Sequence, residues 1–195
     1  RHDTSTDADC RIMKTQDGSF HYAYNAQAVV DEEAQVIVAA DVTRAANDVR
    51  ELPGMLGQVA ANTGRKPKRL LADAGYYSEP NVGACAGAGV DALIATGRLK
   101  HGEEVPDAPR GRIPKDATAK QRMARKLRTK PGREAYERRK AIVEPVFGQM
   151  KTVQGAGRLL LRGLGPARAE WRLLAACHNL RKLWNWHVEN GLMPA

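Results

Sequence analysis

The sequence predicts an α/β fold: a mixed sheet flanked by helices, with a basic irregular insertion before the C-terminal helices. Two β-rich runs near the start predict a hairpin, short apolar runs alternate with helical patterns in the middle, and two long helical patterns close the chain. With 195 residues, 43% of them hydrophobic, the chain has the size and apolar content of one ordinary domain.

The expected hairpin consists of residues 20–30 (FHYAYNAQAVV) and 36–42 (VIVAADV), which are joined by the polar link DEEAQ. Asp31 stands at the end of the first run, where an aspartate typically supports a turn. Asp41 stands near the end of the second. Two antiparallel strands are therefore expected to open the fold.

A helix is expected next, because three apolar residues repeat at helical spacing: Leu52, Leu56 and Val59. Asp48 can cap its start, and Gly64 marks its end. Residues 69–72 and 91–95 then predict two short buried strands on either side of a small helix at 80–89. The order is therefore β-β-α-β-α-β.

Residues 97–132 are poor in apolar side chains and rich in Pro, Gly, Lys and Arg, which predicts an irregular insertion with a short helix at 117–127. The net charge of +9 is concentrated here: residues 110–140 hold thirteen Lys or Arg against three Asp or Glu. Such a stretch gains affinity for nucleic acid by releasing counterions, although a solvated surface loop is the alternative. The insertion is expected to fold fully only on a partner.

Two closing helices are expected at 134–151 and 166–188. The second carries an apolar stripe at helical spacing, which is expected to face the core: Leu173, Leu174, Cys177, Leu180 and Trp184.

Composition excludes several classes of protein. No apolar run is long enough to cross a bilayer, and the first residues lack the apolar centre of a signal peptide, so a cytoplasmic protein is expected. The three cysteines, Cys10, Cys85 and Cys177, form no CxxC pair and predict neither a disulfide framework nor a zinc site. The histidines also lack zinc-ligand spacing.

Asp73 is the first candidate for chemistry. It ends the expected strand at 69–72 and is followed by AGYYS, a turn that can open a crevice at the carboxyl end of the strand. A carboxylate in that place suits Mg²⁺, which prefers hard oxygen ligands. The alternative, which position alone favours, is that Asp73 only caps the turn.

Glu144 is the second candidate. It lies in YERRKAIVEPVFGQMK, where helical spacing places five residues on one face: Tyr136, Lys140, Glu144, Phe147 and Lys151. Apolar neighbours at 142, 143 and 146 suggest a partly buried helix that projects one carboxylate and two cations into a site, and Pro145 is expected to kink the helix. Alternatively, the charged residues are only surface salt-bridge partners.

Together these segments resemble the catalytic core of DDE transposases from bacterial insertion sequences, of the IS4/IS5-like superfamily. The resemblance rests on LADAGYYS around Asp73, on the segment around Glu144 and on HNLRKLW at 178–184. The opening DADCRIMKTQDGSFHYAYNAQAVVD and ADVTRAANDV extend it over nearly the whole chain. It implies a ribonuclease-H-like fold, a two-metal site for Mg²⁺ or Mn²⁺, and the cutting and joining of DNA at element ends. Asp73 would then be the second of three metal-binding catalytic carboxylates, and Glu144 the third.

The same resemblance implies DNA-binding roles for Tyr136, Arg139, Lys140 and Lys151. Glu144 and Lys151 keep the family's six-residue gap. Arg139 has four residues before Glu144 where the family has three, whereas Lys140 has three, so either cation can take the phosphate-contacting role.

The first carboxylate of the family has no counterpart here, because no short motif with Asp, Gly and Thr precedes Phe20. Asp7 and Asp9 resemble the family's approach to the hairpin instead, while Asp31 and Asp48 are expected to be a turn residue and a helix cap. The chain begins with Arg1, so residues 1–195 are expected to be the C-terminal part of a catalytic domain whose first strand is missing, with 97–132 inserted in it.

The expected function is DNA transposition, with insertion-sequence ends and target DNA as partners, a homodimer on DNA by analogy, and no membrane association. The alternatives are a catalytically inactive DNA-binding remnant and a metal-dependent DNA nuclease. A basic RNA-binding protein is disfavoured because no aromatic-rich RNA signature is present.

Overall fold

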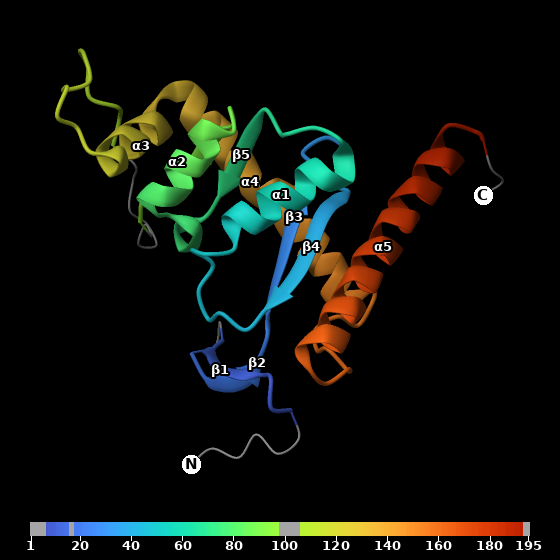
Figure 1. The fold of residues 1–195 in the computed structure, drawn as a ribbon. Coiled ribbons are helices and arrows are strands. Elements are labelled where there is room, and N and C mark those ends of the chain that lie inside the picture. Colours follow the sequence, from blue (N-terminus) through green and yellow to red (C-terminus); the bar gives the residue numbers. More distant parts are fainter. Residues whose placement is uncertain (1–6, 16–17, 98–105, 193–195) are drawn as a thin grey trace. The chain divides into compact units, whose positions relative to one another are not determined.

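The computed structural model describes residues 7–15, 18–97 and 106–192. The chain divides into two compact units, which are considered separately. Unit 1 comprises Arg1–Ala46 and Ile142–Ala195, and unit 2 comprises Asn47–Ala141 (Figure 1). Unit 2 is thus inserted into unit 1, and the long helix α4 (Lys130–Thr152) contributes residues to both.

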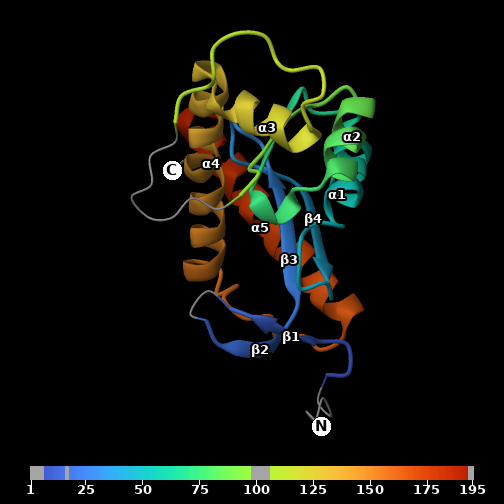
Figure 2. The ribbon, with the colours of Figure 1, turned by 90° about the vertical axis from the view of Figure 1, so that its left-hand side faces the viewer.

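Unit 1 contains two antiparallel strand pairs and a long C-terminal helix. The strands are β1 (Arg11–Lys14), β2 (Phe20–Ala23), β3 (Asn25–Val30) and β4 (Ile37–Thr43). β1 pairs with β2, and β3 pairs with β4. Helix α5 (Leu164–Glu189) lies against β4 (Figure 2).

The predicted hairpin is confirmed as β3–β4, with Asp31 in its turn, where the carboxylate accepts hydrogen bonds from the amides of Glu33 and Ala34. The run at 20–30 differs from the prediction because it is divided into two strands, and the first of them, β2, pairs with β1, which the sequence analysis did not predict.

The prediction that the apolar stripe of α5 faces the core is wrong for four of its five residues, whereas the fifth, Leu174, packs against the core of unit 1. Leu173 and Leu180 are each 64% exposed, Trp184 is half exposed and Cys177 is exposed. The buried residues of α5 are instead Ala167, Trp171, Ala175 and His178. They follow an equally good helical spacing, and polar contacts fix this choice of face.

Those polar contacts join α5 to the hairpin. Trp171 Nε1 donates to the carbonyl of Gln27 at 2.8 Å, and His178 Nε2 lies 2.9 Å from the carbonyl oxygen of Gln35. Asn179 exchanges two hydrogen bonds with the backbone of Ile37, at 2.7 and 2.8 Å. Since a buried polar group left without a partner is costly, these bonds favour the face of α5 that carries Trp171 and His178 over the predicted apolar stripe.

Unit 2 alternates helices with two parallel strands. Its elements are α1 (Leu52–Thr63), β5 (Arg69–Ala72), the 3-10 turn η1 (Ala74–Tyr76), α2 (Glu79–Gly87), β6 (Asp91–Ile94) and α3 (Ala119–Arg128). β5 and β6 pair in parallel. The buried residues Leu52, Cys85, Ile94 and Met123 belong to one core cluster. The predicted β-α-β order of this region is confirmed.

The prediction of one mixed sheet is wrong for the described residues, because their strands form three separate two-stranded sheets. The coarser prediction of a mixed α/β chain is confirmed. Within the described ranges, no helix has the length and apolar character needed to cross a membrane.

The predicted insertion is more ordered than expected where it is described; residues 98–105 lie outside the description. Helix α3 starts with a capping box between Thr118 and Gln121, and its Met123 joins the core of unit 2. Arg122 and Arg125 donate to backbone carbonyls between residues 111 and 117. These two arginines therefore hold the described segment at 111–117 against α3.

Candidate active site

Asp73 follows β5 at its carboxyl end, as predicted. Its carboxylate Oδ1 accepts a hydrogen bond from the amide of Gly75 at 2.8 Å and so caps η1. The capping role is therefore confirmed, but it does not preclude metal binding, because an ionised carboxylate has about four acceptor positions.

A second carboxylate lies at the same turn. A Cβ atom placed on Gly75 would lie 2.8 Å from Asp48 Oδ2 and 3.1 Å from Asp73 Oδ1. Both distances are shorter than ordinary contacts, so only glycine leaves room for the two carboxylates in these positions. The prediction that Asp48 caps α1 is wrong, because the N-cap of α1 is Glu51 and no side chain caps the helix.

Asn81 ties the two carboxylate-bearing segments together. It is 3% exposed and lies in the first turn of α2. Its Nδ2 donates to the carbonyls of Val49 and Tyr76, each at 2.7 Å. Asn81 could not be recognised from the sequence, since an Asn after Ser-Glu-Pro resembles any residue near a helix start.

Tyr76 and Tyr77 pack against the core of unit 2, which supports a packing role for both. Burial, followed by the negative charges of Asp48, Asp73 and Glu51, raises the pKa of Tyr76 above its ordinary value. The phenol therefore stays protonated near neutral pH beside these carboxylates.

Tyr136 and Arg139 lie in the part of α4 that belongs to unit 2. The guanidinium carbon of Arg139 lies 5.6 Å from the centroid of the Tyr136 ring, a cation–π distance. Burial raises the pKa of Tyr136, Arg139 lowers it and Asp73 raises it, with a net increase. The negative charge of Asp73 thus acts on Tyr136, the residue over whose ring the Arg139 guanidinium lies.

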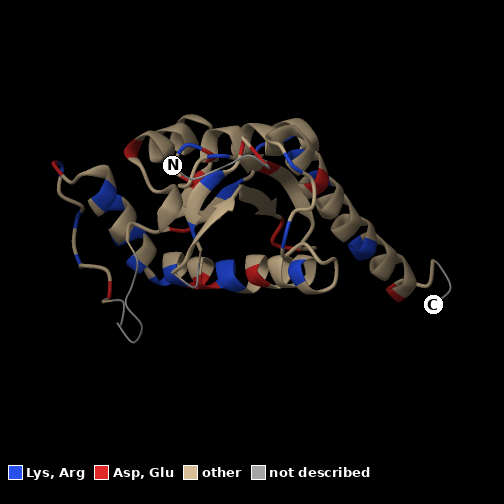
Figure 3. Ribbon diagram, turned by 90° about the horizontal axis from the view of Figure 1, so that it is seen from below, with Lys and Arg blue, Asp and Glu red and all other residues tan. Residues whose placement is uncertain are grey.

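Arg139 and Lys140 differ in their surroundings. Arg139 is half-buried, and its Nε has no hydrogen-bond partner among the described residues. Lys140 is exposed. Figure 3 shows cations along both α3 and α4. The contact with Tyr136 makes Arg139 the more firmly placed of the two candidate phosphate ligands.

Glu144 and Lys151 lie in the part of α4 that belongs to unit 1, and both side chains are exposed. Neighbouring Ile142 and Val146 are buried, which confirms the prediction of a partly buried helix. The helix continues through Pro145. Asp73 and Glu144 belong to different units, so their convergence stays a prediction.

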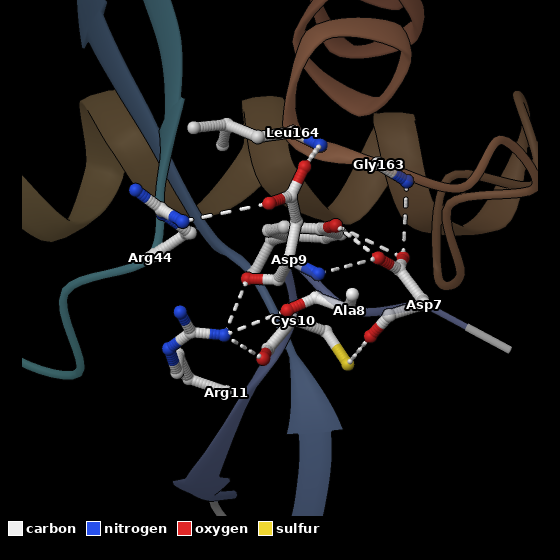
Figure 4. Close-up of polar contacts among 9 residues, drawn as sticks. Asp7, Ala8, Asp9, Cys10, Arg11, Arg44, Gly163 and Leu164 are labelled. Atoms are coloured by element: carbon white, nitrogen blue, oxygen red, sulfur yellow. Dashed lines mark hydrogen bonds and ion pairs between the residues drawn. The ribbon is translucent and has the colours of Figure 1, made fainter. Parts of the chain in front are cut away.

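The remaining acidic candidates have structural partners in unit 1. Asp41 pairs with Arg168 and Arg172 of α5. Asp9 Oδ2 accepts from the amide of Leu164 at 3.0 Å, and Asp7 Oδ2 accepts from the amide of Gly163 at 3.1 Å (Figure 4). These two aspartates therefore cap the start of α5.

Asp7 is held in its ionised form. Burial acts to raise its pKa, but hydrogen bonds outweigh burial and leave the pKa lowered. The donors are the Tyr24 hydroxyl, at 2.8 and 2.9 Å from the two carboxylate oxygens, and groups of Gly163, Asp9 and Cys10. Asp7 is therefore an anchoring carboxylate.

No group of three or more His, Cys, Asp or Glu side chains in the described ranges is arranged to hold a metal ion. The two carboxylates beside Gly75 are nevertheless hard oxygen donors of the kind that Mg²⁺ and Mn²⁺ prefer. The donor chemistry at this turn therefore fits such an ion.

Residues 4–180 match the family described as Transposase DDE domain. No curated protein and no solved structure was found to match the chain.

Proposed function

The chain belongs to the transposase DDE domain family, whose function is DNA transposition, and we propose that it takes part in metal-dependent cleavage and strand transfer at the ends of a bacterial insertion sequence. The observation that carries the proposal is the position of Asp73: a carboxylate at the carboxyl end of β5, beside a second carboxylate. The proposal includes the ribonuclease-H-like fold, the IS4/IS5-like subgroup and a place of action in the bacterial cytoplasm.

In this proposal Asp73 and Glu144 hold Mg²⁺ or Mn²⁺ in a two-metal site. When bound, such ions help to activate the attacking oxygen and stabilise the leaving oxygen of an in-line displacement. The chain's own contribution is to hold the carboxylates in place. Asp73 is oriented by the Gly75 amide, whereas Glu144 projects from α4 next to residues that anchor the helix in the core of unit 1.

The DNA backbone is bound by Arg139 and Lys151, with Tyr136 and Lys140 beside them. Arg139 is favoured over Lys140 for the phosphate of the scissile strand, because its guanidinium is already placed over Tyr136 and can bind phosphate with two parallel hydrogen bonds. Cations of the insertion extend the contact with DNA. A homodimer on paired DNA ends is part of the proposal.

The test is a cleavage assay with Mg²⁺ or Mn²⁺ on supercoiled and element-end DNA, with DNA binding measured in parallel. Asp73→Asn and Glu144→Gln should each abolish cutting and strand transfer while DNA binding persists. Arg139→Ala should weaken binding more than Lys140→Ala, its matched control on the same helix.

Three outcomes would contradict the proposal in different ways. Binding without cutting, in a chain that stays inactive when an upstream segment with the first carboxylate is added, would identify an inactive DNA-binding remnant. Cutting without strand transfer would identify a nuclease. Cutting that survives both carboxylate substitutions would show that Asp73 and Glu144 are not the metal ligands.

A further inference from the structure

Asn81 makes two hydrogen bonds that converge from different segments of unit 2. One acceptor is the carbonyl of Val49, directly after Asp48, and the other is the carbonyl of Tyr76, which closes the turn that Asp73 opens. Each bond is 2.7 Å long. Both N–H groups of one amide therefore join the Asp48 loop to the Asp73 turn.

The amide is itself fixed in place. Asn81 is almost completely buried, and its backbone N–H donates to Ser78 Oγ at 3.1 Å in the cap of α2. Because buried hydrogen bonds are costly to break, the side chain has little freedom to leave its two acceptors. Helix α2 thus serves as a rigid support for both segments.

The two carboxylates oppose the close approach of these segments. Asp48 Oδ2 and Asp73 Oδ1 lie 2.8 and 3.1 Å from the position that a Cβ on Gly75 would take, and like charges at such close range repel each other. Neither segment is a regular strand or long helix that would hold it in place by its own hydrogen-bond ladder. A cross-link between their backbones opposes that repulsion.

We propose that Asn81 is a positioning residue for Asp73: it clamps the Asp48 loop onto the Asp73 turn and so fixes the Asp73 carboxylate in the orientation that binds a divalent cation. This inference rests on the proposed function, in which Asp73 is a metal ligand. Asn81 does not touch the ion; it acts through the backbone of the turn. Groups that orient a ligand in this way typically contribute 10- to 100-fold to metal affinity.

The test compares Asn81→Leu with the unaltered chain. Leucine has the branched shape and the same number of side-chain heavy atoms as asparagine but no hydrogen-bonding group, and unlike aspartate it adds no charge that would itself attract a cation. Asn81→Ala, which introduces no extra atoms, is the second variant should leucine prevent folding. Asn179→Leu is the control in unit 1, because the Asn179 side chain also makes two hydrogen bonds with backbone groups, both of Ile37.

Two quantities are measured: the Kd for Mn²⁺, followed by its electron paramagnetic resonance signal, and amide hydrogen exchange. Asn81→Leu should raise the Kd about tenfold and speed exchange selectively at the amides of Glu51, Gly75 and Tyr76. Asn179→Leu should destabilise the protein without changing either quantity at this turn.

An unchanged Kd in Asn81→Leu, together with loss of Mn²⁺ binding in Asp73→Asn, would overturn the inference and leave the proposed function standing. Uniformly faster exchange throughout unit 2 would show that Asn81 only supports the fold, and would also overturn it. Mn²⁺ binding that is insensitive to Asp73→Asn would remove the proposed metal role itself, and the positioning role with it.

Discussion

Gly75→Ala should separate the geometry of the Asp73 turn from the stability of the fold. The new Cβ would lie 2.8 Å from Asp48 Oδ2 and 3.1 Å from Asp73 Oδ1. To restore an ordinary contact of about 3.4 Å, Asp48 Oδ2 must move by about 0.6 Å and Asp73 Oδ1 by about 0.3 Å. Both atoms are at the ends of side chains, so they can move without unfolding the turn.

Such shifts matter more for a bound ion than for folding. Mg²⁺ demands oxygens at about 2.0–2.1 Å in near-octahedral geometry, so a ligand displaced by about 0.3 Å no longer fits. We expect a roughly tenfold weaker affinity for Mg²⁺ or Mn²⁺, which corresponds to about 1.4 kcal/mol. The free energy of unfolding should change by less than about 1 kcal/mol, because the reduced freedom of the unfolded chain offsets the crowding.

The assay is a Mn²⁺ titration beside urea unfolding, with Gly83→Ala as the control. Gly83 is exposed in α2, and an added Cβ would meet nothing within 4 Å. This control should stabilise the protein by about 0.5–1 kcal/mol and leave the Mn²⁺ affinity unchanged. Unaltered Mn²⁺ affinity in Gly75→Ala would refute the reasoning that Asp73 and Asp48 are held at this glycine for a cation.

Three further predictions concern unit 1, each measured by urea unfolding. Asp9→Ala should lower the unfolding free energy by about 1 kcal/mol, since the amide of Leu164 loses its acceptor; no loss would show that α5 needs no cap there. Asp7→Asn should lower the unfolding free energy at pH 7. The difference in unfolding free energy between the unaltered protein and this variant should fade as the pH falls below the ordinary pKa of 3.8 and through the lowered pKa of Asp7. A difference in unfolding free energy that persists at pH 2 would contradict the role of an ionised Asp7. Trp171→Phe should lower the unfolding free energy by about 1–3 kcal/mol because the hydrogen bond from the indole Nε1 to the carbonyl of Gln27 is lost, whereas an unchanged free energy would mean that this bond contributes nothing.

Local sequence patterns were sufficient to predict those elements whose structure depends on residues close by in the chain. The strands β5 and β6 could be predicted because short apolar runs stand between turn residues, and α1 ends at Gly64 because its φ of 70° suits glycine. Asp73 was identified as a candidate for the same reason: its place after β5 can be inferred from sequence.

Long-range contacts account for what the sequence did not reveal. Two faces of α5 have helical apolar spacing, and the choice between them depends on hydrogen bonds to residues such as Gln27, which lies 144 positions away from Trp171. The position of Asp48 likewise depends on the clamp by Asn81, 32 residues beyond the Val49 carbonyl. Neither partner can be recognised from spacing alone.

The insertion of unit 2 within unit 1 has a consequence for folding during synthesis. The hairpin β3–β4 leaves the ribosome before its partner α5 is made, because Ile37 and Asn179, which are hydrogen-bonded, are separated by 142 positions of chain. Unit 2 is complete before unit 1 can close, and until then the apolar side of the hairpin has no cover from α5. Chains that end before Leu164 should therefore contain a protease-resistant unit 2 and a protease-sensitive β3–β4 hairpin, so that α5 commits these strands to their fold.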